Sequence, residues 1–162
     1  MLQTPDTLRA NWLASQALGD KLFSSDAILV PENYPSMFLL FKEFPMPVLS
    51  TGEAAEVPMP HGALGYEVTQ LKVNHQGQVS IADTTQKEVE KFLAVVRNNK
   101  GKFNAWLYEG TQEKYAKAYY LENCSLALET VGRDTEARQQ LLYIAGTINY
   151  VYFGIKDKKG NL

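Results

Sequence analysis

The side chains that most often carry chemistry in proteins are few in this chain and lie far apart. The sequence holds two histidines, His61 and His75, and a single cysteine, Cys124. Neither histidine has a partner at a spacing used for zinc, so both are interpreted as solvated loop residues. No activating motif lies near Cys124, which we expect to be a small buried hydrophobic residue in a strand.

Carboxylates and phosphate-binding loops give no stronger signal. Glu53 and Glu56 form a small acidic pair, but a two-carboxylate hydrolase needs rigid placement of both groups around a cleft. The segment NNKGK at 98–102 lacks the spaced glycines and the Ser/Thr of a phosphate loop. The sequence predicts a protein that is not an enzyme, with no cofactor and no metal. Catalytic groups can still converge without a local signature.

Length and charge restrict the class of protein. The 162 residues predict a single domain. The net charge of −2 argues against a protein that grips nucleic-acid backbones, because such binding needs a clustered basic face. Neither a signal peptide nor a membrane span is predicted. We therefore expect a protein that is soluble and cytosolic at the point of synthesis.

The first third of the chain predicts one helix and one strand. Residues 5–18 suit a short amphipathic helix with Leu8, Trp12 and Leu18 on one face and Gly19 as its stop. Residues 26–35 contain two prolines and are interpreted as a connector. The apolar run at 36–44 lies between Pro35 and Pro45, which favours a buried strand.

A second helix is predicted near the middle of the chain. Thr85 and Glu88 stand at capping-box spacing, and Gly101 can end the helix. An apolar stripe follows at helical spacing and is expected to pack on the sheet. It consists of Val89, Phe92, Leu93 and Val96.

From residue 103 onward the apolar period becomes two, which predicts strands. One side of the middle strand would carry Tyr120, Cys124, Leu126 and Leu128. The closing strand would place in register Leu142, Ile144, Ile148, Tyr150 and Tyr152. The tail 155–162 is polar and expected to fray. Strands and helices do not alternate, so we predict an α+β fold, mainly β: an antiparallel sandwich or barrel with one packed helix and a short N-terminal helix.

Residues 47–66, PVLSTGEAAEVPMPHGALGY, form an unusual stretch. It contains three prolines, three glycines and no lysine or arginine. It is too long for a hairpin turn, so it is interpreted as a long loop. An enzyme loop would carry convergent ionisable groups, and this one holds only two glutamates and one histidine. The stretch is therefore either a substrate loop or an arm that reaches another copy of the chain, and its residue types weigh against the substrate loop.

Two segments carry a resemblance to a known family. In GQVSIADTTQKEVEKFL a strand ends at Asp83 and leads into a helix with Glu88 in its first turn and the pair Phe92-Leu93. Residues 118–153 then form a long strand, a turn and a last aromatic-rich strand. From Phe38 to Phe153 the order of elements resembles the tail tube proteins of bacteriophages. These are relatives of the inner tubes of contractile injection systems and of the type VI secretion tube.

The resemblance implies a structural, self-assembling virion protein. Six protomers would form a ring, and rings would stack into a viral tail tube whose lumen conducts DNA during ejection without binding it specifically. A contractile tail, tail sheath and baseplate partners, location in the virion tail and synthesis in the host bacterial cytoplasm are implied as well. The tube-like barrel would span 36–154. Residues 1–35, a helix and connector, would add a subunit contact.

The resemblance also gives residues 47–66 a role in contacts between subunits and between rings. The residues expected in this arm are Val48, Glu53, Glu56, Val57, Met59, His61 and Tyr66, with Val57 and Met59 as its apolar anchors. Two alternatives stay open. One is a baseplate protein of the same fold that initiates the tube. The other is a small barrel that binds an apolar ligand, which would need an underfilled interior.

Overall fold

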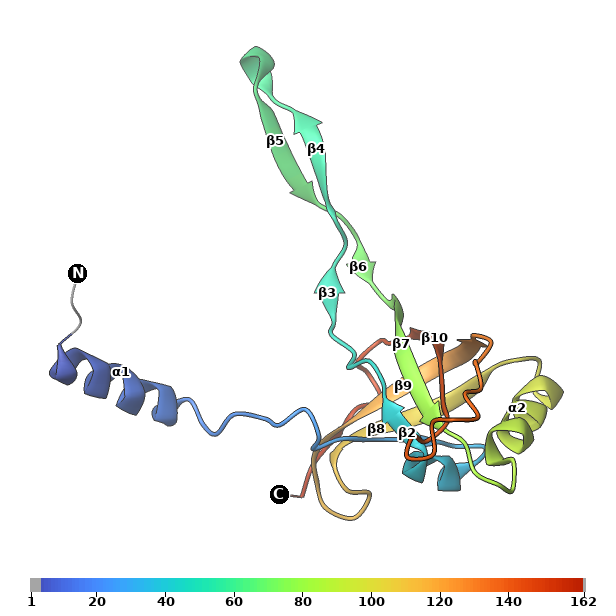
Figure 1. Ribbon diagram of the computed structural model, residues 1–162. Coiled ribbons are helices and arrows are strands. Elements are labelled where there is room, and N and C mark those ends of the chain that lie inside the picture. The colour runs from blue at the N-terminus through green and yellow to red at the C-terminus, as the bar shows by residue number, and fades with distance from the viewer. Residues whose placement is uncertain (1–3, 162) are drawn as a thin grey trace.

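The computed structural model describes residues 4–161. A nearly closed, barrel-like antiparallel sheet forms the body, and two segments project from it (Figure 1). One projection is the helix α1 (Pro5–Ala17), and the other is a long hairpin. This architecture confirms the predicted α+β class and the antiparallel sheet.

The main sheet has the strand order β1-β8-β9-β10-β7-β2, and every pairing in it is antiparallel. Its strands are β1 (Ile28–Pro31), β2 (Phe41–Glu43), β7 (Asn74–Ala82), β8 (Phe103–Gly110), β9 (Tyr115–Leu128) and β10 (Tyr143–Val151). A short strand, β11 (Lys158–Lys159), adds to β9. Strand β10 pairs with residues 122–128 of β9 on one side and with β7 on the other, so the aromatic-rich closing strand predicted from sequence lies inside the sheet.

The core lies between this sheet and the helix α2 (Glu88–Asn98). Phe92 of α2 is fully buried, and its ring lies 5.3 Å from that of Phe103 and 6.2 Å from those of Tyr34 and Phe41, measured between centroids. Val89 and Val96 are buried beside it, and Leu93 is partly buried. Cys124 is fully buried in β9, as predicted.

Two predictions for residues 26–44 were wrong. The expected connector contains β1, whose Leu29 and Val30 are buried against β8. The expected strand at 36–44 begins instead as a 3-10 helix, η1 (Pro35–Leu39), and only Phe41–Glu43 pairs with β7. Pro35 occupies the first turn of η1, where a missing N–H costs nothing. The strand therefore begins only at Phe41.

The start of α2 also differs from the prediction. The helix begins at Glu88 after Lys87, which adopts a left-handed conformation at φ 58°, and no side chain caps it. Glu88 accepts a 2.5 Å hydrogen bond from the Tyr34 hydroxyl instead of reaching back to Thr85. The hydrogen bond from Tyr34, a residue distant in sequence, takes the place of the predicted capping box. Gly101 does follow the helix end, at φ 76°, and its N–H donates to the Val96 carbonyl.

The inward face of β9 changes phase at a β-bulge. Both neighbouring strands show an extra β9 residue around Asn123, which has φ 50°. Tyr119 and Leu121 point into the core before the bulge, and Cys124 does so after it. The prediction that Tyr120 shares the side of Cys124 was therefore wrong, because uninterrupted alternation cannot anticipate an inserted residue.

Residues 155–161 of the C-terminal tail are held by pairing, contrary to the expected fraying, and residue 162 lies outside the described residues. Lys158 and Lys159 pair with β9, and the Asn161 side chain bonds to the backbone of Glu113 and Tyr115. Asp157 accepts a hydrogen bond from the buried Tyr152 hydroxyl and lies 3.6 Å from Lys117.

Candidate assembly surfaces

The stretch predicted to be a loop forms most of a long two-stranded hairpin, called the arm below (residues 48–73). Its strands are β3 (Ser50–Thr51) paired with β6 (Leu71–Lys72), and β4 (Ala54–Pro58) paired with β5 (Leu64–Val68). The turn at the tip is η2 (Pro60–Gly62). Figure 1 shows the arm standing clear of the sheet. Of the three prolines that suggested a loop, Pro47 precedes the arm, Pro58 ends β4 and Pro60 begins the turn.

Local chemistry explains the tip. The Met59 N–H donates to the Ala63 carbonyl at 2.8 Å and closes the turn. His61 takes a left-handed conformation at φ 64°. The Met59 side chain packs over Gly65, where an added Cβ would lie 2.5 Å from the Met59 sulfur. The tip is therefore built from specific contacts.

Strand alternation gives the far half of the arm two different faces. Glu56 pairs with Tyr66, Ala54 with Val68, and Pro58 with Leu64, so these six residues share one face. This face, called the ribbon face below, is rich in exposed apolar side chains. Leu64 is 65% exposed, Tyr66 73% and Val68 70%. The opposite face carries Ala55, Val57, Gly65 and Glu67.

The structure places all seven predicted arm residues on or beside this hairpin. Glu56 and Tyr66 lie on the ribbon face, and Val57 on the opposite face is only partly exposed. Glu53 joins β3 to β4, and its carbonyl accepts a 2.6 Å hydrogen bond from the Thr69 hydroxyl. Val48 lies at the root, and Met59 and His61 lie at the tip. Leu64 and Val68 were missed because the return strand alternates weakly in sequence.

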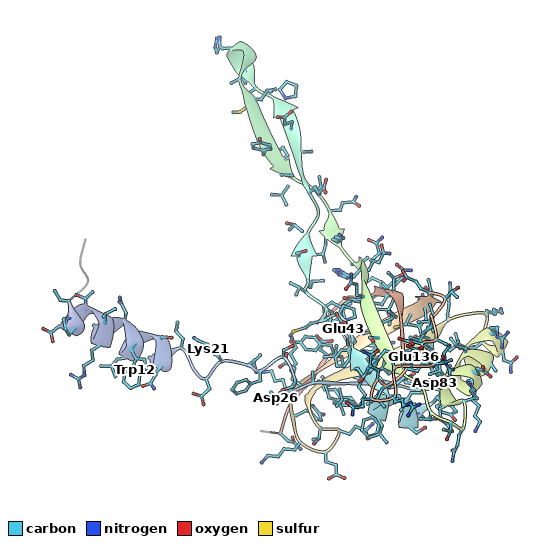
Figure 2. All side chains as sticks on the ribbon, in the orientation of Figure 1. Trp12, Lys21, Asp26, Glu43, Asp83 and Glu136 are labelled. Atoms are coloured by element: carbon cyan, nitrogen blue, oxygen red, sulfur yellow. The ribbon has the colours of Figure 1, made fainter. Side chains whose placement is uncertain are left out.

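The second projection is α1 with the connector that follows it. The Thr4 side chain accepts from the Thr7 N–H at the helix start, and Gly19 follows the helix at φ 99°. No residue of α1 is buried. Even its large apolar side chains are exposed, Leu8 to 51% and Trp12 to 58%. Figure 2 shows Trp12 far from the body, with Lys21 on the connector and Asp26 where the chain reaches the sheet. A helix of this length is marginal alone in water, which makes α1 a candidate for a second partner contact.

The connector helps to form a surface cavity of about 320 Å³. It is lined by Leu22 and Phe23 of the connector and by Phe44, Met46 and Leu107 of the body. Leu22 and Phe23 are more than 70% exposed despite this contact. The cavity is thus an open apolar hollow at the foot of the N-terminal projection.

Burial and packing in the body account for the shifted pKa values of its titratable groups. Burial raises the pKa of the Cys124 thiol to about 12. Burial, with a 2.9 Å hydrogen bond to Glu109, raises the pKa of Tyr119 to about 12. His75 was predicted to be a solvated loop residue, but it lies in β7, stacked on Tyr150 at 5.5 Å between centroids. Its Nε2 has no hydrogen-bond partner in residues 4–161, and burial lowers its pKa.

Within the described part of the chain, no group of three or more His, Cys, Asp or Glu side chains could hold a metal ion. No helix of residues 4–161 is both long enough and apolar enough to cross a membrane.

Known proteins resemble this chain in structure. One similar chain belongs to the anti-feeding prophage cap, the AFP tube-terminating cap, with a TM-score of 0.64, 9% identity, and coverage of 87% of this chain and 93% of that chain. Another belongs to the PVC sheath-tube complex of an extracellular contractile injection system in the extended state, with a TM-score of 0.59, 10% identity, and coverage of 90% and 97%. A third belongs to the anti-feeding prophage baseplate, with a TM-score of 0.54, 10% identity, and coverage of 89% and 99%.

The chain has a tail tube-related fold. Neither a family model nor a curated protein matches the sequence. This chain and the similar chains are only about 10% identical in sequence, so they have a fold in common but not a set of side chains. The arm and α1 must therefore be interpreted from this chain's own residues.

Proposed function

We propose that this protein is a structural subunit of a phage or phage-like contractile tail, which assembles with copies of itself into hexameric rings that stack as a tube. In this role it has no catalytic activity. The lumen conducts DNA during ejection without specific binding, and tail sheath and baseplate proteins are its partners. Synthesis takes place in the host cytoplasm, and the finished protein resides in the tail.

The observation that carries the proposal is the arm. Its ribbon face exposes Leu64, Tyr66 and Val68 on a hairpin that makes no packed layer with its own sheet. Exposed apolar side chains gathered on one face mark interaction sites. Two-stranded hairpins are marginal in water unless something packs on them, so the arm suits a partner surface. The tail tube-related fold makes another copy the first candidate partner.

The filled interior weighs against a small-ligand barrel. Bulky side chains from α2, from η1 and from the inner face of the sheet occupy the core, including Phe92, Met37, Phe103 and Tyr150. The apolar cavity beside Phe44 and Met46 is open to the surface and shaped partly by the N-terminal connector. A contact between chains explains this hollow more simply than a bound metabolite.

A closely related second role, that of a protein that starts or ends the tube, is supported by the proteins of similar structure. The similar chains come from a tube-terminating cap and a baseplate as well as from a sheath-tube complex. A protein that starts or ends the tube would form a single ring instead of a stack.

Light scattering coupled to size exclusion, with negative-stain images of the same fractions, tests these roles. Tubes of constant diameter support the tube subunit, and isolated rings support the initiator or terminator. A chain that stays an 18.2 kDa monomer at high concentration, with and without baseplate extract, contradicts both.

A further inference from the structure

The ribbon face combines apolar side chains with one central carboxylate. Glu56 lies directly across from Tyr66, between the pairs Ala54–Val68 and Pro58–Leu64. Residues 50–68 also contain Glu53 and Glu67 but no lysine or arginine. A partner surface that covers this face must therefore be apolar and must offer a cation, because a carboxylate buried without a partner is costly.

A surface with this chemistry exists elsewhere on the same chain. We define the C-terminal patch as Phe153, Ile155, Lys156 and Lys158, all exposed. Ile155 is 85% exposed and Phe153 46%. The Lys158 ammonium lies 4.5 Å from the centre of the Trp106 ring. Lys156 is already paired with Glu122 at 3.0 Å, whereas no carboxylate lies within 4.0 Å of the Lys158 ammonium among the described residues.

Lysines slightly outnumber carboxylates in the wider surroundings of the patch. The segment 113–119, which leads into β9, and the final segment (156–161) pair through β11 and carry five lysines and two carboxylates. Two further carboxylates lie close by, Glu122 beside Lys156 and Glu32 beside Trp106. The arm segment 50–68 carries three carboxylates, of which Glu56 lies on the ribbon face and Glu67 on the opposite face. The two surfaces are therefore complementary both in apolar character and in charge, and charge complementarity of this kind selects partners and fixes register.

The two surfaces lie at opposite ends of the arm. The C-terminal patch borders the arm's root, where a Cβ placed on Gly154 would lie 3.5 Å from the Leu49 side chain. The ribbon face lies at the far half, and an extended chain from Val48 to Pro60 spans about 40 Å at ~3.3 Å per residue. The ribbon face of one copy can thus reach a second copy but not its own patch.

We propose that the ribbon face of one chain docks on the C-terminal patch of a second copy, with Glu56 facing Lys158. This inference rests on the proposed function and specifies the surfaces that the arm joins. The contact is head-to-tail, since two different patches of one chain meet, and such contacts propagate into rings or stacks. A standard stable interface buries roughly 1,600 Å², and this contact is proposed to work together with other contacts of the assembly.

Charge reversal tests the pairing. Glu56→Lys and Lys158→Glu should each raise the concentration needed for assembly by about fivefold or more, and the double variant should restore it to near the wild-type value. Glu67→Lys is the matched control, because it makes the same charge change on the opposite face of the same ribbon. It should have a much smaller effect. Circular dichroism melting checks that each variant remains folded.

Cross-linking provides a second readout that does not depend on tube formation. A mixture of Tyr66→Cys and Ile155→Cys chains, treated with a short bis-maleimide, should give a covalent dimer, whereas a mixture of Glu67→Cys and Ile155→Cys should not. The native Cys124 is buried and will not compete.

The outcomes separate the two proposals. Assembled wild-type protein with no rescue by the charge swap and no cross-link overturns the docking inference and leaves the tail role standing. A wild-type chain that never assembles contradicts the tail role, and the cross-link then decides the docking inference. A dimer supports the inference, and its absence at high concentration overturns it.

Discussion

The Asn104 side chain accepts a 3.2 Å hydrogen bond from the backbone N–H of Asn123, at the bulge where β9 changes phase. Asn123 has φ 50°, a left-handed conformation that asparagine tolerates better than most residues. The bulge lets Leu121 and Cys124 both point into the core although they are three positions apart. This pair of asparagines therefore helps to set the inward face of a central strand.

Substitution of Asn123 tests this role. Asn123→Val should destabilise the fold by about 1–2 kcal/mol, because a β-branched residue disfavours the left-handed conformation. Asn123→Gly should have little effect, since glycine adopts that conformation readily. Denaturant unfolding of the three proteins is the measurement. Equal stability of the valine and glycine variants would show that the bulge is not held by this conformation.

A close approach of strands makes Gly146 a second sensitive position. A Cβ there would lie 2.2 Å from the Ala127 carbonyl oxygen and 2.7 Å from the Leu128 Cα. Both neighbours belong to the backbone, so Gly146→Ala must push β10 away from β9 and should cost about 1–3 kcal/mol. Gly132→Ala is the control, because a Cβ there has nothing within 4 Å. Its unfolding free energy should stay within about 0.5 kcal/mol of wild type.

The lowered pKa of His75 predicts that the stability of the fold depends on pH. Burial, together with the nearby Lys72, holds the pKa of His75 below its usual 6.5, so folding favours the neutral imidazole. As pH falls through the range below 6.5, the unfolded chain binds more protons at this site than the folded chain, and stability decreases. Thermal melting between pH 7.5 and 5.5 should show this loss.

The variant His75→Phe keeps an aromatic ring against Tyr150 but removes the titration. Its melting temperature should fall less with decreasing pH than that of wild type. His61→Gln, at the exposed tip of the arm, should retain the wild-type slope. If His75→Phe and wild type have the same slope, the acid sensitivity originates at other groups.

Removal of residues 1–18 separates folding from assembly. The helix α1 contributes no buried residue, so the truncated barrel should unfold within about 0.5 kcal/mol of the full chain. Its assembly should weaken, because Leu8 and Trp12 would no longer be available to a partner. Light scattering measures assembly, and denaturant titration measures stability. A large loss of stability would show that α1 packs on its own barrel in solution.

Local sequence patterns were enough to predict the helices and strands whose apolar periodicity lies within the element itself. The stripe from Val89 to Val96 gave α2, and period-two alternation gave β8 and β10. The lack of strand-helix alternation gave an antiparallel sheet. Residues 47–66 were marked as unusual by their prolines and glycines. The resemblance in the order of elements pointed to the tail tube-related fold, which the structural neighbours confirm.

Tertiary structure decided what depends on partners distant in the chain. Glu88 could not be paired with Tyr34 from sequence, because nothing local brings η1 beside α2. The arm could not be recognised as a hairpin, because its weakly alternating return strand is specified by pairing with β4 and not by an apolar core. The same pairing places Glu56 among exposed apolar side chains. The sequence by itself determined a β-rich body with one packed helix, and only long-range pairing decided which surfaces it leaves exposed for other chains.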